Sequence, residues 1–269
     1  MKTKMLMTIA VTALLAGACS RGLESGSGKG FITLSLSNAP CFEQASKAVN
    51  ENLYRDTDHY DVVITSSTGK EVLKCKGGEL SSNTPKELDM GTYKVVASYG
   101  TDADASRDGF YVEGQASVVL QPKEERTVEI TCTPTCGKVS VNFSSDMATY
   151  YSDYYVEYGG TEALGSKTVK FGKGETDPWY IKLKPEGETV SYKICLTAND
   201  AYQQKDASGN VQKTAVITGS FELKRNKAHK FNIKPNYTPQ TEGGMGLTIT
   251  IDESTEDRNV KIEVPVSWI

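Results

Sequence analysis

The sequence predicts an all-β chain of two tandem β-sandwiches that follow a signal peptide and a flexible tether. Short runs of alternating apolar and polar residues fill the chain after residue 30, and several of them recur about one hundred residues later. The first eighteen residues have the charge and hydrophobicity of an export signal. The 269 residues carry 34 acidic and 30 basic side chains, a net charge of −4 that argues against a nucleic-acid partner.

Residues 1–18 are predicted to be a lipoprotein signal peptide. Lys2 and Lys4 precede an apolar run from Met5 to Leu15, which is too short to span a membrane. The run ends in Ala-Gly-Ala-Cys19, and this end resembles a bacterial lipobox. The resemblance implies cleavage before Cys19 and acylation of that residue, which would anchor the chain stably in a membrane. The alternative is ordinary signal cleavage with Cys19 incidental.

Residues 19–27 are predicted to be a flexible tether, because Ser20 to Gly30 is rich in glycine and serine. With Cys19 as the anchor, we expect the membrane to be a partner and the outer membrane to be the location. Glu24 is the single acidic residue close behind Cys19. The sequence therefore leaves open whether the chain faces the cell surface or the periplasm.

The strands follow from alternation and from enrichment in β-branched and aromatic residues, with Gly, Asn, Asp and Ser at the turns. One short helix is expected between Cys41 and Leu53. The predicted strands are Phe31 to Leu36, Tyr60 to Thr65, Tyr93 to Ser98, Ala116 to Leu120, Thr127 to Cys132, Val139 to Phe143, Tyr154 to Tyr158, Trp179 to Leu183, Ser191 to Thr197, Ala215 to Leu223, Lys230 to Ile233, Leu247 to Ile251 and Val260 to Val266.

The recurrence divides the chain into residues 28–133 and residues 134–269. The run that begins at Gly30 is echoed from Gly137, the run from Thr92 is echoed from Ser191, and the run from Val128 is echoed from Phe231. Each copy would hold about seven short strands, the size of an immunoglobulin/transthyretin-like sandwich. The alternative is that strand patterns converge without duplication.

Alternation also predicts which side chains form the core, since successive residues of a strand face opposite sides of the sheet. The residues expected to be buried are Ile32, Leu34, Val63, Val95, Val119, Ile130, Val139, Val141, Ile194, Phe221, Ile249 and Ile262.

Five cysteines remain besides Cys19, so they cannot all pair within the chain. An oxidising envelope compartment permits disulfides, and the sequence suggests Cys132–Cys136 and Cys41–Cys75. The alternative is buried free thiols, which we favour for Cys195. Cysteine spacing and the two histidines do not favour a zinc site.

One acidic loop has the spacing of a calcium loop: Asp102, Asp104 and Asp108 are followed by Glu113. Oxygen ligands on alternate residues with a late glutamate suit Ca²⁺. Arg107 stands where such a loop needs glycine, however, and an arginine would repel the cation. The alternative is a solvated acidic loop with no metal.

Five tyrosines lie between residues 150 and 158. Tyrosine can stack on sugars or bind proteins, so Tyr154 and Tyr158 are candidates for a binding face, with Trp179 and Tyr180 as neighbours. The alternative is that one face of this strand is core. A strand places Tyr154 and Tyr158 on one face and Tyr155 on the other.

The sequence contains no GxSxG, HExxH, P-loop or strand-linked GxGxxG motif, so it predicts neither an enzyme nor a cofactor. The sequence favours a non-catalytic adhesion or structural module, with a glycan-binding lipoprotein and a glycan-processing enzyme as the alternatives. A strand-exchanging subunit would need a spare strand, and Val260 to Ile269 is the candidate. That run also follows Leu247 to Ile251 as a local hairpin would.

Four segments carry a resemblance to a known family: Lys70-Glu71-Val72 after a Ser-Thr-Gly turn, Gly91 to Gly100, Thr127 to Cys132 with Gly137 to Val141, and Leu247 to Asp252 with Ile262 to Pro265 and Trp268. They resemble the domain-of-unknown-function 4493 family of Bacteroides-type lipoproteins. This resemblance implies a cell-envelope lipoprotein of tandem β-sandwiches with no assigned activity. Besides the membrane, we expect other envelope proteins or glycans as partners. A second likeness, to fimbrillin-type adhesin subunits, rests on fold texture.

Overall fold

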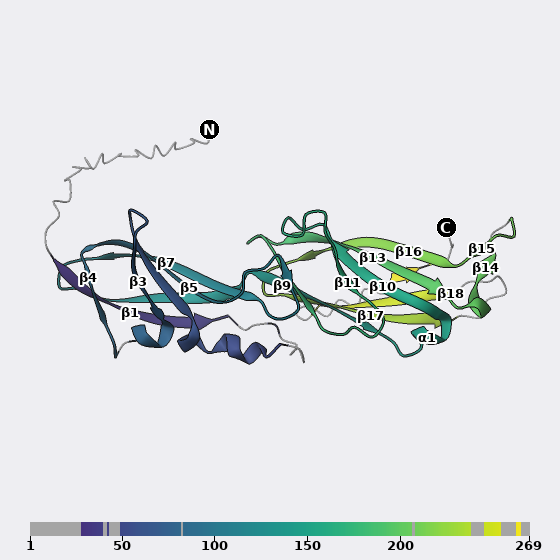
Figure 1. Cartoon of the computed structure of the whole chain (residues 1–269), viewed down its shortest axis with the longest axis horizontal. Coiled ribbons are helices and arrows are strands. Elements are labelled where there is room, and N and C mark those ends of the chain that lie inside the picture. Colours follow the sequence, from purple (N-terminus) through teal and green to yellow (C-terminus); the bar gives the residue numbers. More distant parts are fainter. Residues whose placement is uncertain are drawn as a thin grey trace, which may run out of the picture.

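A computed structural model describes residues 28–39, 42, 49–81, 83–205, 208–237, 245–253 and 262–264. The described chain is elongated and has two lobes, the first formed by residues 28–134 and the second by residues 136–264 (Figure 1). Strands dominate both lobes, so the all-β prediction is confirmed. No helix in these ranges is long and apolar enough to cross a membrane.

The first lobe is one seven-stranded sheet of order β3-β2-β5-β7-β8-β1-β4 that folds into two layers. β8 pairs with β1 in parallel over eight residue pairs, whereas it meets β7 only at Val112–Pro134 and Glu113–Thr133. The layers β3-β2-β5-β7 and β8-β1-β4 therefore separate along most of β7. The strands are β1 (Lys29–Asn38), β2 (Asp61–Ser66), β3 (Glu71–Lys76), β4 (Lys86–Asp89), β5 (Gly91–Gly100), β7 (Tyr111–Leu120) and β8 (Glu125–Pro134).

The second lobe has two main sheets, of order β11-β10-β13-β16 and β19-β18-β17-β9-β12-β6. Its outermost strand β6 (Ala105–Ser106) comes from the sequence of the first lobe. The other elements are β9 (Cys136–Phe143), α1 (Met147–Tyr150), β10 (Tyr151–Gly159), β11 (Val169–Phe171), β12 (Trp179–Lys182), β13 (Glu188–Ala198), β14 (Gln204–Lys205), β15 (Val211–Gln212), β16 (Thr214–Leu223), β17 (Ala228–Tyr237), β18 (Met245–Glu253) and β19 (Ile262–Val264).

The two lobes share one strand order. The series β3-β2-β5-β7 corresponds to β11-β10-β13-β16, and β8-β1-β4 corresponds to β17-β9-β12, with the parallel pair in the same place. The sequence echoes fall on equivalent strands: β1 and β9, β5 and β13, β8 and β17. The domain limits at residues 133 and 134 stay a prediction. The local hairpin reading of the C-terminal run fits the antiparallel pairing of β19 with β18.

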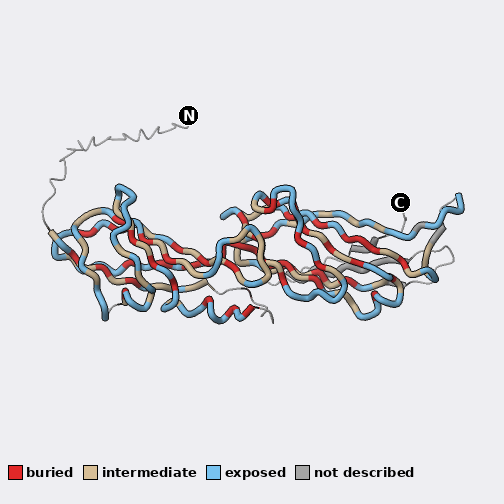
Figure 2. Tube along the Cα trace, in the orientation of Figure 1, coloured by how far each residue is buried: buried red, intermediate tan, exposed pale blue. Residues whose placement is uncertain are grey.

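Each lobe has its own hydrophobic core, buried between its layers (Figure 2). Ile32, Leu34, Val95, Ile130, Val139, Val141 and Ile194 are buried as predicted. The predicted burial of Val119 is wrong, because this side chain is 53% exposed while Val118 and Leu120 are buried. The predicted burial of Val63 is also wrong, since Val62 and Ile64 face the core and Val63 is half-buried.

Phe221 is only partly buried, although it packs against the second core. The side chains of Ile249 and Ile262 lie outside the described ones. Most of the predicted helix between residues 41 and 53 also lies outside them, and Glu51–Arg55 forms a 3-10 helix. Shorter 3-10 turns cover Thr57–His59, Gly77–Leu80 and Asp200–Tyr202.

Candidate functional site

The predicted binding face on β10 is part of the core. Tyr154 is 5% exposed, and Tyr158 is fully buried among Phe171, Phe221 and Phe231, with ring centroids 5.5 to 6.0 Å away. Successive residues of β10 alternate faces, and the core takes the face that carries these two tyrosines. Neither side chain reaches solvent to stack on a sugar, so the surface-binding role predicted for them is wrong.

Tyr155 lies on the opposite face of β10. Its ring is half-buried, and the Lys170 ammonium lies 3.6 Å from the ring centroid. A hydrogen bond with the Cys195 side chain is the main cause that raises the pKa of Tyr155 to about 12. The outward aromatic ring of this strand is therefore already engaged by neighbouring side chains.

Trp179 and Tyr180 are adjacent in β12 and point to opposite faces. Trp179 packs against the second core, whereas Tyr180 is buried in the core of the first lobe. The two predicted neighbours therefore do not form one aromatic patch. Each instead takes part in a contact between the lobes.

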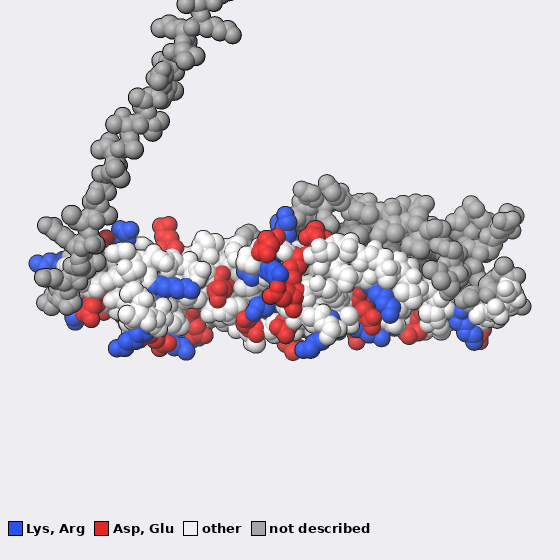
Figure 3. All heavy atoms as spheres, turned by 90° about the horizontal axis from the view of Figure 1, so that it is seen from above, with Lys and Arg blue, Asp and Glu red and all other residues white. Residues whose placement is uncertain are grey.

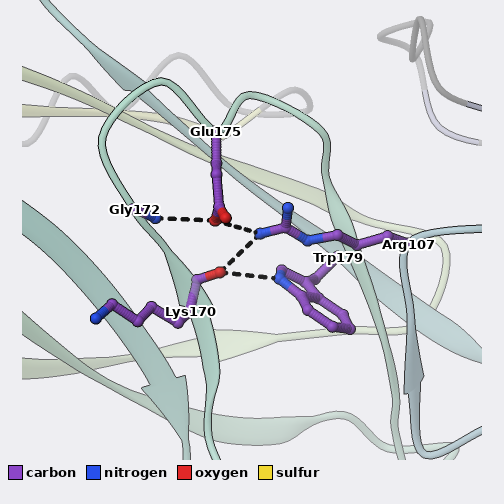
Figure 4. Close-up of polar contacts among 5 residues, drawn as sticks. All are labelled: Arg107, Lys170, Gly172, Glu175 and Trp179. Atoms are coloured by element: carbon purple, nitrogen blue, oxygen red, sulfur yellow. Dashed lines mark hydrogen bonds and ion pairs between the residues drawn. The ribbon is translucent and has the colours of Figure 1, made fainter.

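Arg107 forms the first of these contacts, which we call the arginine latch (Figure 4). It follows β6, and its guanidinium lies 4.8 Å from the Trp179 ring centroid. Nη2 donates hydrogen bonds to the Lys170 carbonyl oxygen at 2.7 Å and to Glu175 Oε2 at 2.9 Å. Trp179 Nε1 donates to the same carbonyl at 3.2 Å. A side chain from the first lobe's sequence thus joins β11, β12 and the loop between them in the second lobe.

The latch should also be visible in the titration of Glu175. Its carboxylate accepts a hydrogen bond from the Gly172 backbone N–H at 2.9 Å as well as the one from Arg107. These two contacts, the backbone bond first, lower the pKa of Glu175 below its usual 4.5. A lowered carboxyl pKa contributes stability above the unfolded value and loses it as pH falls through the folded value. The side chain is half-exposed, so solvent screening keeps this contribution small.

A buried ion pair forms the second contact, which we call the junction pair. Lys138 Nζ of β9 lies 2.7 Å from Glu51 Oε1 of the first lobe, and the side chains are 5% and 8% exposed. The Tyr180 hydroxyl donates to the same oxygen at 2.6 Å. Three residues from distant parts of the chain therefore meet at one carboxylate.

Aromatic rings surround the junction pair. Phe110 lies between Tyr54, Phe42 and Tyr180, with ring centroids 3.8, 5.3 and 4.9 Å away. The Lys138 ammonium lies 5.6 Å from the Phe42 centroid. Such an apolar surrounding strengthens the attraction of the two charges and raises the cost of separating them.

Backbone hydrogen bonds complete the junction. Thr135 lies between β8 and β9, accepts from the Leu183 N–H at 3.1 Å and donates to the Tyr111 carbonyl at 2.9 Å. β6 pairs with β12 through Tyr180–Ser106 and Ile181–Ala105. The lobes are joined by sheet pairing, a buried ion pair and the arginine latch together. This combination predicts a stiff joint.

The acidic residues of the candidate calcium loop form no metal-binding group among the described residues. Asp102 instead forms an ion pair with Lys182, at 2.7 Å. Glu113 accepts a hydrogen bond from the Tyr111 hydroxyl at 3.4 Å, and the backbone of Asp104 binds the Lys182 N–H. Among the described residues, no group of three or more His, Cys, Asp and Glu side chains, Asp108 included, could hold a metal ion.

The cysteines do not form the predicted disulfides in the structure. Cys132 is a buried free thiol, so the Cys132–Cys136 bond is absent. Cys75 is also free, and Cys41 lies outside the described residues. Burial raises the pKa of the Cys132 thiol to about 11, which keeps it protonated and unreactive at neutral pH.

Charges are mixed on the surface. On the described part of the face in Figure 3, acidic and basic side chains are interspersed, and none of it forms a basic stripe. A groove of about 410 Å³ near the junction is lined by residues that include Lys182, Lys184 and Glu162, and Lys184 pairs with Glu162 at 2.6 Å. Interspersed charges of both signs suit a surface that contacts other proteins, whereas a surface that binds polyanions would be mainly basic.

Sequence reasoning missed the residues that join the lobes. Lys138 and Glu51 are ordinary charged residues in the sequence, and Arg107 was noticed only as an obstacle to calcium. Alternation did place Lys138 on the face opposite Val139, but it could not show that the first lobe covers that face.

Replacing Arg107 with alanine should loosen the latch without unfolding either lobe. In a Trp268→Phe background, Trp179 is the sole tryptophan, so its emission should shift to longer wavelength as its ring gains water. Lysine at position 107 should restore little, because it lacks the planar guanidinium that lies over the Trp179 and Phe171 rings. An unchanged emission spectrum in the alanine variant would show that the latch does not hold Trp179.

Comparison with known proteins gives low-identity structural matches. A proposed cell adhesion protein from Parabacteroides distasonis ATCC 8503 is 9% identical, with 85% of this chain and 100% of that chain covered and a TM-score of 0.44. The fimbrial anchor protein Mfa2 from Porphyromonas gingivalis is 9% identical, with 83% and 97% covered and a TM-score of 0.41. The search of curated proteins finds no match. Residues 28–266 match the model of the domain of unknown function DUF4493, and the chain belongs to this family.

Proposed function

We propose that this chain is a non-catalytic adhesion or structural module of the cell envelope, anchored to the outer membrane through acylated Cys19. The observation that carries the proposal is the locked junction, because it makes one stiff body of two sandwich-like lobes. A protein that only needed two independent binding domains would not require a buried ion pair and shared sheet pairing between them.

The position of β1 adds to this argument. β1 begins at the end of the first lobe that lies farthest from the second lobe (Figure 1). An anchor at Cys19 would hold that end at the membrane and direct the second lobe outward. Two ten-residue strands laid end to end, such as β8 and β17, span roughly 65 Å at about 3.3 Å per residue. The module would thus act as a rigid spacer that presents its distal lobe to other envelope or surface proteins.

The glycan-binding alternative has lost the residues on which it rested. Tyr154, Tyr158 and Tyr180 are buried, and Trp179 is covered on one side by Arg107. The surface that remains for recognition is formed by strands and their edges. We therefore propose that the chain binds other proteins through the exposed faces and the edge backbone of its strands.

Replacing Cys19 with alanine tests the anchor. We expect the wild-type chain to incorporate labelled fatty acid and to yield an acylated N-terminal peptide that begins at Cys19, in mass spectrometry of the membrane fraction. The alanine variant should incorporate none. Ser20→Ala is the matched control and should be acylated normally. Acylation of the Cys19 variant, or an unmodified wild-type peptide, would overturn the anchoring.

Protease treatment of intact cells then distinguishes the two faces of the membrane. Cleavage of the chain in intact cells would place it at the surface, whereas protection until the outer membrane is opened would place it on the periplasmic side. In the surface case, deletion of the chain should reduce attachment of cells to one another or to a host surface. If the chain is exposed at the cell surface and its deletion leaves attachment unchanged, the adhesion role is contradicted.

A further inference from the structure

The strand β16 is a long sheet edge without the usual protection. It ends the sheet β11-β10-β13-β16, and its other side has no strand among the described residues. Edge strands are normally short or carry lysine or proline, which prevents pairing with other chains. Other edges here follow that rule: β11 and β19 have three residues each, β4 has four, and β3 contains two lysines. β16 has ten residues with no lysine, arginine or proline.

Several apolar side chains of β16 also remain exposed or only partly buried. Val216 is 50% exposed on the outer face. On the inner face, Ile217 and Phe221 pack against the second core yet stay only partly buried. Pairing with another strand would cover these residues from the open side and remove apolar surface from water.

The sequence of β16 is complementary to itself in one antiparallel register. With Thr218 opposite Thr218 of a second copy, Val216 faces Ser220 and Thr214 faces Glu222 on the outer side. On the inner side, Phe221 faces Ala215 and Ile217 faces Gly219, so each large residue meets a small one. Glu222 is the single charged residue of the strand, and this register keeps the two copies of it apart.

We propose that β16 pairs with β16 of a second copy of this chain, with Thr218 at the two-fold axis. The two four-stranded sheets then form one continuous sheet of eight strands. The interface is isologous, because each copy offers the same strand and the pairing closes on itself. Main-chain hydrogen bonds supply affinity, and the alternation of large and small residues sets the register.

The direction of β16 determines what such a pair does. The long strands of the second lobe run along the length of the molecule (Figure 1). Antiparallel pairing therefore places the two first lobes, and the two starts of β1, at opposite ends. If each chain is anchored as in the proposed function, on which this step rests, the pair joins two facing membranes. The partner of the module is then the same protein on a neighbouring cell.

Cysteine cross-linking tests the register in the full chain. Directly opposed residues of an antiparallel pair have Cα atoms about 4.5–5.5 Å apart, within the range of a disulfide. Thr218→Cys should therefore give a disulfide-linked dimer under mild oxidation. Ser220→Cys is the matched control on the same exposed face, because Ser220 would be offset from its own copy by about 14 Å along the strand, at about 3.4 Å per residue over four residues. A mixture of Val216→Cys and Ser220→Cys chains should cross-link.

Mass spectrometry of the dimers identifies which residues are linked. The unmodified chain, which retains its native cysteines, is the control for cross-links that those cysteines form. Cross-linking of Thr218→Cys no faster than of Ser220→Cys would overturn the pairing. Thr218→Lys should abolish the dimer at unchanged melting temperature, whereas lysine at exposed Ser117 in β7 should not. A dimer that survives Thr218→Lys would likewise overturn it.

Two cell populations that carry differently tagged Thr218→Cys chains test the facing arrangement. After mixing and oxidation, dimers with both tags are expected. Dimers with only one tag would overturn the arrangement between cells. The outcomes are separable from those of the proposed function: lost cross-linking with Cys19 still acylated removes only this inference, and absent acylation removes the anchor while the solubilised chain still tests the pairing.

Discussion

Glutamine at position 51 should lower the free energy of unfolding by about 3–5 kcal/mol, the largest effect expected of any single charged residue here. Glu51 holds the ammonium of Lys138 at 2.7 Å inside an apolar surrounding. The substitution keeps the size of the side chain but removes the negative charge that lies 2.7 Å from the buried lysine ammonium. Urea denaturation curves of the variant and the wild type measure the loss.

Two controls define the origin of this loss. Glu87→Gln removes an ion pair of similar length, 2.8 Å to Lys29, between exposed side chains, and should cost clearly less, because solvent screens exposed charges. The double variant Glu51→Leu/Lys138→Met should recover much of the stability, since an apolar pair of similar volume replaces two buried charges. Equal losses from Glu51→Gln and Glu87→Gln would show that burial does not amplify the junction pair.

Alanine at position 158 should cost about 3–5 kcal/mol, because it removes a fully buried ring and leaves a cavity between Phe171, Phe221 and Phe231. Phenylalanine at the same position should cost nothing or stabilise the fold by about 1 kcal/mol. The Tyr158 hydroxyl is buried and accepts or donates no hydrogen bond among the described residues. Removing a buried polar group without a partner relieves its desolvation penalty.

Tyr155→Ala is the control on the other face of β10 and should cost clearly less than Tyr158→Ala, because Tyr155 is only half-buried. Thermal and urea denaturation of the three variants give the comparison. A large loss from Tyr158→Phe would indicate that the hydroxyl has a structural partner and would contradict this account.

Alternation alone placed most of the predicted core residues correctly, and it failed at two of the places where two valines are adjacent. Val62-Val63 and Val118-Val119 fit either face of a strand, and the choice of Val63 and Val119 was wrong in both places. A one-residue shift moves every side chain to the other face, so local pattern cannot decide when both positions are apolar. At Leu34 and Ile130, polar neighbours on both sides removed the ambiguity.

The junction was beyond the reach of sequence for a different reason. Glu51 and Lys138 are 87 positions apart, and Glu51 and Tyr180 are 129 apart. Nothing in a local window shows that a sheet face of one lobe is covered by another lobe. The tyrosines of β10 illustrate the same limit, since a core and a binding face have the same period of two.

The parallel pairing of β1 and β8 has a mechanical consequence. β1 begins at the outer end of the first lobe, and β8 ends at Pro134, beside the second lobe. A pull between residue 28 and the second lobe therefore draws the two strands past each other along their length. The pairs from Phe31–Glu125 to Asn38–Cys132 are loaded together in shear rather than opened in sequence. The rate of forced unfolding is set by the barrier to rupture of that whole ladder, so tension reaches the far lobe before the near one yields.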